Sequence, residues 1–256
     1  MSETSTTPDQ KVIVVGDLHL FAARSRGLDH WEQLPGRIAA SNAGRCVLMG
    51  DIFDFPWARQ LGKKRAITKA ASMVEELIAK FPSTQFHYLY GNHDQHPEFE
   101  HQLELHGNTF GNLTCHSVCL RIANTVFMHG DAADRRDMDT ETMVRRRRDR
   151  TTRPLHGGIH EFLYGLAVRL RIDEAVTAPP FFPDFIHRRL IDFIERQGHE
   201  NIEHIVYGHT HRKIQQHRYD GITFTNAGAP SGYRRYEHLT LKIRPSIPHQ
   251  STCGIS

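Results

Sequence analysis

The chain has 256 residues and a mass of 29.4 kDa, a size that suits one large domain or one domain with an inserted cap. Hydrophobic residues make up 39% of it and charged residues 24%, which is typical of globular proteins that bury a core. No apolar run approaches the roughly 20 residues of a membrane helix, and a net charge of +3 is too small to indicate nucleic-acid binding. We therefore expect neither a membrane span nor a nucleic-acid partner.

The two ends of the chain are predicted to lie outside the folded domain. Residues 1–10 are polar and rich in Ser and Thr, which predicts a disordered lead. This segment lacks the positively charged start and the apolar middle of a signal peptide, so we expect a cytoplasmic protein. The predicted domain covers residues 11–245, and residues 246–256 form a C-terminal tail.

Short apolar runs alternate with helical patterns along the chain, and this alternation indicates an α/β fold. Five runs are too short for helices and predict buried strands: Val12–Val15, Cys46–Met49, Tyr88–Tyr90, Val126–Met128 and Ile205–Tyr207. Between the second and third runs, Ile67–Phe81 carries apolar residues at helical spacing. The stretch Asn201–Ile243 holds strand-like pieces separated by turn residues such as Asp220-Gly221, which predicts a mostly antiparallel end of the fold.

Residues 132–200 differ from the rest of the chain. They contain three helix-like segments, Met138–Arg150, Ile159–Ile172 and Phe185–Gln197, and a proline-rich break at 178–183 separates the last two. We predict that this region is a helical cap insertion lying over the main fold. The apolar segments Phe162–Leu170 and Phe181–Ile194 are expected to be packing faces of its helices.

Each of the five strand-like runs ends with a Gly close to a polar side chain that can bind a metal. The five motifs are Gly16-Asp17-Leu18-His19, Gly50-Asp51-Ile52-Phe53-Asp54, Gly91-Asn92-His93-Asp94, His129-Gly130-Asp131 and Gly208-His209-Thr210-His211. In open α/β sheets, ligands bind beyond the carboxyl ends of the strands, and Gly lets the backbone turn sharply there. Five loops are therefore predicted to bring these side chains to one place.

The chemistry of these side chains predicts a dinuclear metal site. The candidate ligands are Asp17, His19, Asp51, Asn92, His129, His209 and His211. Imidazole, carboxylate and amide groups without thiolate suit divalent ions, with Mn²⁺ expected first and Fe or Zn²⁺ as alternatives. Seven ligands fit two ions that share a bridging carboxylate, and such a pair lowers the pKa of a bound water from about 15.7 towards 7. The pattern therefore predicts hydrolysis of a phosphate ester or pyrophosphate by a metal-bridging hydroxide.

In this order, over about Val12 to Pro230, the motifs resemble those of the calcineurin-like metallophosphoesterases. The resemblance implies a sandwich of two mixed β-sheets flanked by helices. It assigns Asp17, His19, Asp51 and His211 to one ion, and Asp51, Asn92, His129 and His209 to the other, with Asp51 bridging. It implies that His93 protonates the leaving oxygen or stabilises the transition state. Asp54 matches the residue that orients this histidine in some members, and Asp94 is a rival for that role.

Within the family, the opening Asp17-Leu18-His19-Leu20 and the helical insertion resemble the UDP-2,3-diacylglucosamine pyrophosphatase group of lipid A synthesis. This resemblance implies a phosphorylated small-molecule or nucleotide-sugar substrate and, for a lipid-bearing one, peripheral contact with lipid. The best-known members of that group carry Arg where this chain has His93. A non-catalytic metal-binding module on the same fold is the alternative of another class. Such modules have lost ligands or the histidine, whereas every position is filled here.

An arginine-rich stretch within the predicted cap runs from Arg145 to Arg153. Arginine grips phosphate groups through forked hydrogen bonds. Consecutive arginines point around the whole helix, so at most one or two of the four at 145–148 can face a single site. We expect Arg145 and Arg148 to contact the substrate.

Overall fold

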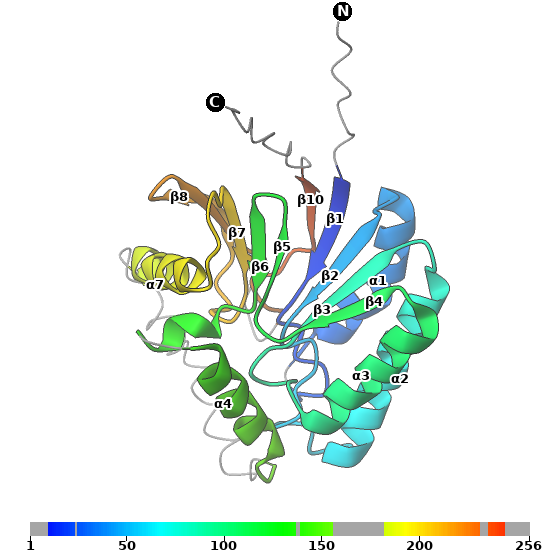
Figure 1. Cartoon of the computed structure of the whole chain (residues 1–256). Coiled ribbons are helices and arrows are strands. Elements are labelled where there is room, and N and C mark those ends of the chain that lie inside the picture. The colour runs from blue at the N-terminus through cyan, green and yellow to red at the C-terminus, as the bar shows by residue number, and fades with distance from the viewer. Residues whose placement is uncertain (1–9, 24, 137–138, 156–181, 231–234, 244–256) are drawn as a thin grey trace, which may run out of the picture.

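Two five-stranded sheets form the centre of the computed structural model, which describes residues 10–23, 25–136, 139–155, 182–230 and 235–243 (Figure 1). The first sheet has the order β10 (Leu239–Ile243), β1 (Gln10–Val15), β2 (Arg45–Met49), β3 (Gln85–Leu89), β4 (Leu113–His116). The second has the order β5 (Cys119–Ile122), β6 (Thr125–Met128), β7 (His204–Tyr207), β9 (Ile222–Asn226), β8 (Ile214–Tyr219). Both are mixed, because β10, β5 and β8 run antiparallel to otherwise parallel neighbours.

The sheets pack face to face and helices cover their outer sides. Alternate residues of β1 and β2 meet residues of β6 and β7 in an apolar layer that includes Val14, Val47, Phe127 and Val206. Three helices, α1 (Gly27–Ser41), α2 (Lys63–Lys80) and α3 (Pro97–Phe110), cover the first sheet, and α7 (Phe182–Arg196) covers the second. The expected α/β sandwich of two mixed sheets flanked by helices is confirmed.

All five predicted strands are present, and the predicted helix at Ile67–Phe81 corresponds to α2. The prediction of a mostly antiparallel end is correct only in part. Strands β8 and β9 form an antiparallel hairpin at Asp220-Gly221, but β9 lies parallel to β7. Helices α1 and α3 were not predicted. Helix α1 contains Pro35, which interrupts the helical pattern of its sequence. Helix α3 begins after His96, the residue that caps its N-terminus, and Pro97 occupies its first position.

The two described helices of the predicted cap region lie in different parts of the structure. Helix α4 (Thr140–Thr152) lies beside the ends of the strands, and its assignment to a cap stays a prediction. Helix α7 packs its apolar face, including Ile186, Leu190 and Phe193, against the second sheet, so this end of the region belongs to the sandwich. The predicted helix Ile159–Ile172, the apolar segment Phe162–Leu170, residues 1–9 of the lead and the tail lie outside the described residues; Gln10 begins β1. Among the helices that are described, none is long and apolar enough to cross a membrane.

A buried arginine fixes α4 to both sheets. Arg147 is 2% exposed, and its guanidinium donates from two nitrogens to the Asp131 carboxylate, which follows β6. Its third nitrogen donates to the carbonyl oxygens of Tyr90 (2.8 Å) and Ser117 (2.6 Å). Although burial opposes ionisation of Asp131, Arg147 holds its pKa well below the usual range. This network sets the position of α4 over the strand ends.

Replacing this arginine should destabilise the fold. We expect Arg147→Met to lower the free energy of unfolding by about 3–5 kcal/mol, because it leaves the Asp131 carboxylate buried without its cation. Urea denaturation measures the change. The control Arg148→Ala removes an exposed pair with Glu100 and should cost at most about 1 kcal/mol. Equal losses in the two variants would contradict the anchoring role of Arg147.

Candidate metal centre

The loops that follow β1, β2, β3, β6 and β7 converge at one edge of the sandwich and bring the seven predicted ligands together. Hydrogen bonds between backbones join the loops, since the Asp17 and His19 amides donate to the carbonyl oxygens of Gly50 and Asp51. Three groups of side chains result, each with ligand atoms within 4.8 Å of one another: Asp17, His19 and His211; Asp51, His129 and His209; and His19, Asp51 and His93. The first two groups consist of proposed ligands alone.

Asp51 lies between the two groups. Its Oδ2 atom is 3.3 Å from Nε2 of His129 in one group and 3.7 Å from Nε2 of His19 in the other. Asn92 completes the second group, because its Oδ1 atom is 2.9 Å from His129 Nε2 and 3.1 Å from His209 Nδ1. In the first group, Nε2 of His211 faces Nε2 of His19 at 2.9 Å. This arrangement supports our proposal that Asp51 bridges two ions.

The backbone at the centre adopts strained φ values of the kind that cluster at functional sites. Five of the seven proposed ligands have a left-handed φ, between 49° and 68°: Asp17, His19, Asp51, His209 and His211. Residues other than Gly rarely adopt this backbone conformation. The carboxylates also press on glycine backbones: a Cβ atom at Gly91 would lie 2.2 Å from Asp51, and one at Gly208 would lie 2.2 Å from Asp17. Gly91 and Gly208 are therefore required by close approach.

Two carboxylates outside the proposed ligand set orient its histidines. Asp54 accepts hydrogen bonds from Nδ1 of His19 at 3.0 Å and from Nδ1 of His93 at 2.9 Å, one on each oxygen. Because a carboxylate only accepts, it fixes the proton of both rings on Nδ1 and leaves Nε2 of His19 free to bind an ion. Asp134 accepts from Nε2 of His209 in the same way, which leaves Nδ1 facing Asn92.

Asp94 is placed differently from its rival Asp54. Its carboxylate accepts from the Tyr88 hydroxyl at 2.7 Å and from the amides of Ile52 and Gly91 at 2.9 and 2.7 Å. Asp94 therefore joins the loops after β2 and β3, whereas Asp54 contacts the ring of His93. We propose Asp54 alone as the residue that orients His93.

The charges at the centre fit divalent cations. Burial alone lowers the pKa of His19 and His129, but neighbouring carboxylates, chiefly Asp54 and Asp51, raise both values to about 9. Burial likewise raises the pKa of Asp17. The raised pKa values of the histidines show that carboxylates surround these rings, whereas the raised pKa of Asp17 reflects its burial. Two divalent ions would supply these buried carboxylates with positive charge, so the oxygen and nitrogen donors present fit the expected group.

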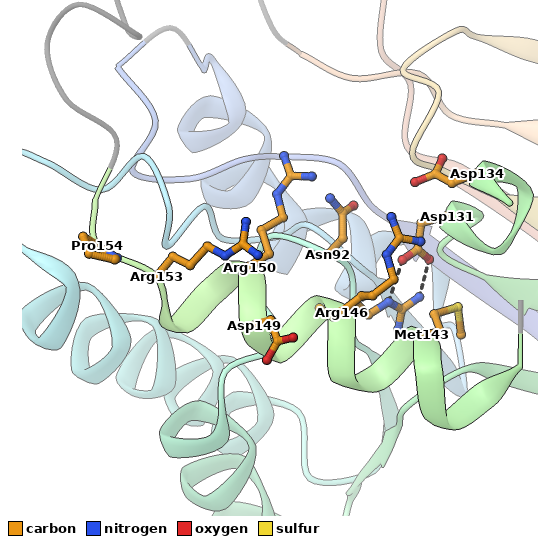
Figure 2. A pocket seen from close by; sticks show the side chains of 10 residues that line it. Asn92, Asp131, Asp134, Met143, Arg146, Asp149, Arg150, Arg153 and Pro154 are labelled. Atoms are coloured by element: carbon orange, nitrogen blue, oxygen red, sulfur yellow. Dashed lines mark hydrogen bonds and ion pairs between the residues drawn. The ribbon is translucent and has the colours of Figure 1, made fainter.

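A pocket of about 380 Å³ lies beside the centre, and arginines of α4 form one side of it (Figure 2). Arg146 and Arg150 of α4 line the pocket with Asn92, since positions i and i+4 share one helix face, and Arg153 at the C-terminal cap of α4 lines it as well. Nη2 of Arg150 donates to Nε2 of His93 at 2.9 Å. Arg145 and Arg148, which we predicted to contact the substrate, do not line this pocket: Arg145 is exposed and Arg148 pairs with Glu100.

The comparison with known families decides the classification. The sequence model of the calcineurin-like phosphoesterase family matches residues 10–213. These residues run from β1 to the loop that holds His209 and His211. The chain belongs to this family. It is therefore a metal-dependent phosphoesterase, a hydrolase acting on phosphoester bonds, and the family implies a dinuclear centre of divalent ions.

The comparison with solved structures found similarity to other phosphoesterases at low sequence identity. A dimetal phosphatase from Danio rerio is 12% identical, with a TM-score of 0.49 over 93% of this chain and 94% of its own. An archaeal phosphodiesterase is 13% identical, with a TM-score of 0.41 over 91% and 100%. The Pseudomonas putida nuclease MPE is 12% identical, with a TM-score of 0.39 over 93% and 81%. No curated protein matches the chain.

Five residues of the site were not singled out from the sequence. Asp134 lies in a region with no strand pattern, and Arg146, Arg147, Arg150 and Arg153 were hidden in the arginine run. The helical spacing of Arg146, Arg150 and Arg153 was the available signal. It becomes informative only when Arg147 is known to face inward, because burial of that residue sets the rotation of the helix.

Removing the charge of the central carboxylate should empty the site. We expect Asp51→Asn to lose both metal ions and activity, because both ions share that carboxylate. Elemental analysis of the purified protein measures the ion content. The control Asp220→Asn changes an exposed turn residue to one that the same turn accepts. An active Asp51→Asn protein with its full metal content would refute the bridging assignment.

Proposed function

We propose that this enzyme hydrolyses a phosphate ester or pyrophosphate bond in a small anionic substrate that carries a second phosphate group. The observation that carries the proposal is the contact between Arg150 of α4 and His93 of the β3 loop. It places a cationic helix face against the residue beside the candidate ligands. A phosphoryl group at the centre would thus have the arginines of α4 within reach for its neighbouring phosphate.

The proposed ligands divide between two ions as the two side-chain groups do. One ion would be held by Asp17, His19, Asp51 and His211, and the other by Asp51, Asn92, His129 and His209. When bound, the pair supplies an activated water and positive charge for the phosphoryl oxygens. Imidazole and oxygen donors suit Mn²⁺, which we propose as the first ion to test, with Fe and Zn²⁺ as alternatives.

His93 is proposed to act on the leaving oxygen. Its side chain is 12% exposed at the edge of the centre, and Asp54 holds its Nδ1 proton. Although burial opposes ionisation of Asp54, His93 and His19 lower its pKa to about 2, so the carboxylate stays charged and keeps both rings oriented. A substrate phosphate that takes the Arg150 donors would leave Nε2 of His93 facing the reacting group, where it can carry a proton to the leaving oxygen.

Removing this imidazole should separate chemistry from metal binding. We expect His93→Ala to keep both ions and to lose about 10²- to 10⁴-fold in turnover of an alkyl phosphate, whose leaving group needs a proton. The loss should be much smaller for nitrophenyl phosphate. Steady-state rates on both substrates and metal analysis give the comparison, with the exposed His101→Ala as control. Equal losses on the two substrates would argue against proton donation by His93.

The arginine face of α4 is proposed to recognise the second phosphate. We place Arg146, Arg150 and Arg153 in this role instead of Arg145 and Arg148, because the first three line the pocket. Arg150→Ala should raise the KM for a pyrophosphate substrate at least about 10-fold, since it removes a charge-assisted hydrogen bond. Arg145→Ala on the exposed side of the same helix is the matched control. Equal KM values in the two variants would contradict this assignment.

The substrate itself is tested by Mn²⁺-dependent release of UMP from UDP-2,3-diacylglucosamine, with Asp51→Asn as the blank. The helical insertion and the cationic pocket favour a nucleotide-sugar diphosphate of this kind. Release of UMP by the unaltered protein, but not by Asp51→Asn, would support a pyrophosphatase that acts on this substrate. Absence of release with turnover of simpler esters removes that substrate and leaves the phosphoesterase. Metal binding without hydrolysis of any phosphate ester would favour the non-catalytic module.

A further inference from the structure

A second cluster of metal-capable side chains lies where α7 packs against the second sheet. Asp184 and His187 are one helical turn apart on α7, and His217 belongs to β8. Their ligand atoms lie within 4.8 Å of one another. Oδ1 of Asp184 is 2.9 Å from Nε2 of His217, and the rings of His187 and His217 have centroids 5.1 Å apart. None of the three belongs to the centre described above.

Neighbouring groups fix the ring of His187, as they do for histidines that bind metals. Its side chain is fully buried, and its ring stacks on Phe224 with centroids 3.9 Å apart. Nε2 is 2.9 Å from the Tyr207 hydroxyl oxygen, whereas Nδ1 is buried with no hydrogen-bond partner among the described residues. A buried polar atom without a partner is costly. When Nε2–H donates to Tyr207, Nδ1 carries the lone pair that a cation requires.

We propose that Asp184, His187 and His217 form a mononuclear site for a divalent transition ion, with Zn²⁺ as the ion that this donor set suits best. Two imidazoles and one carboxylate are a frequent zinc set, and water supplies the fourth ligand of such sites. Water can reach this one, because the side chains of Asp184 and His217 are 49% and 40% exposed.

To hold an ion, the donor atoms would move from separations of up to 4.8 Å towards those of a tetrahedral site. Ligands about 2.1 Å from a tetrahedral ion lie roughly 3.4 Å apart, and Asp184 and His217 are already in contact. Exposed Asp184 and His217 can adjust towards the fixed ring of His187.

The bound ion would attach α7 to the edge strand of the second sheet. Arg189 of the same helix donates to the Ala133 carbonyl oxygen in the short helix η1 (Asp131–Asp134). That short helix also supplies Asp131, the partner of Arg147, and Asp134, the partner of His209. An ion at this position therefore stabilises the element that supports one side of the phosphoesterase centre, without taking part in its chemistry.

The test is the metal content of the full-length protein after removal of its ions by a chelator and reloading with Zn²⁺. Elemental analysis should find one ion fewer per chain in His217→Ala than in the unaltered protein. Asp184→Asn should hold the same ion more weakly in a competition with a chelating dye. His217 is partly exposed, so the variant should fold, which circular dichroism checks.

The matched control is His101→Ala, which removes an exposed histidine from α3 and should keep the full Zn²⁺ content. Equal contents in His217→Ala and the unaltered protein would overturn the proposal. Loss of one ion in His101→Ala as well would also overturn it, because it would show unspecific binding to surface histidines. This readout does not depend on phosphoesterase activity, so failure of the proposed function leaves it intact.

Discussion

The structure depends on the burial of several carboxylates at one edge of the sandwich. Asp17, Asp51 and Asp54 are each at most 3% exposed, and burial of like charges is strongly unfavourable unless cations or donors compensate. Histidines and backbone amides supply part of the compensation, and the strained φ values of the loops hold these groups in range. The remaining negative charge makes the site a strong attractor for divalent ions, which is the basis of the family's chemistry.

Asp54 connects two tasks that the sequence presents as separate. One oxygen orients His19, a proposed ligand, and the other orients His93, the proposed proton donor. The geometry of ion binding and the geometry at the leaving group are thus set by the same carboxylate. On the other side of the centre, Asp134 sets the ring of His209. The histidines would otherwise be free to rotate or to protonate on the wrong nitrogen.

Much of the fold and of the centre could be predicted because both follow strand ends. A strand end is marked in the sequence by an apolar run, a Gly and a polar side chain, and parallel strands necessarily bring such ends together. The pairing of β9 with β7 could not be predicted, because a short apolar run carries no direction. The pocket arginines could not be chosen either, since the rotation of α4 depends on the contact of Arg147 with residues far away in the sequence.

The buried position of Arg147 has a consequence for how substrate preference changes in evolution. It is attached to Asp131 and to two backbone carbonyl groups, so the helix keeps its place whatever stands at the neighbouring positions. Arg146, Arg150 and Arg153 can then be exchanged one at a time without moving the wall that carries them. Under the proposed role of these arginines, single substitutions would change substrate specificity while the proposed metal ligands keep their positions.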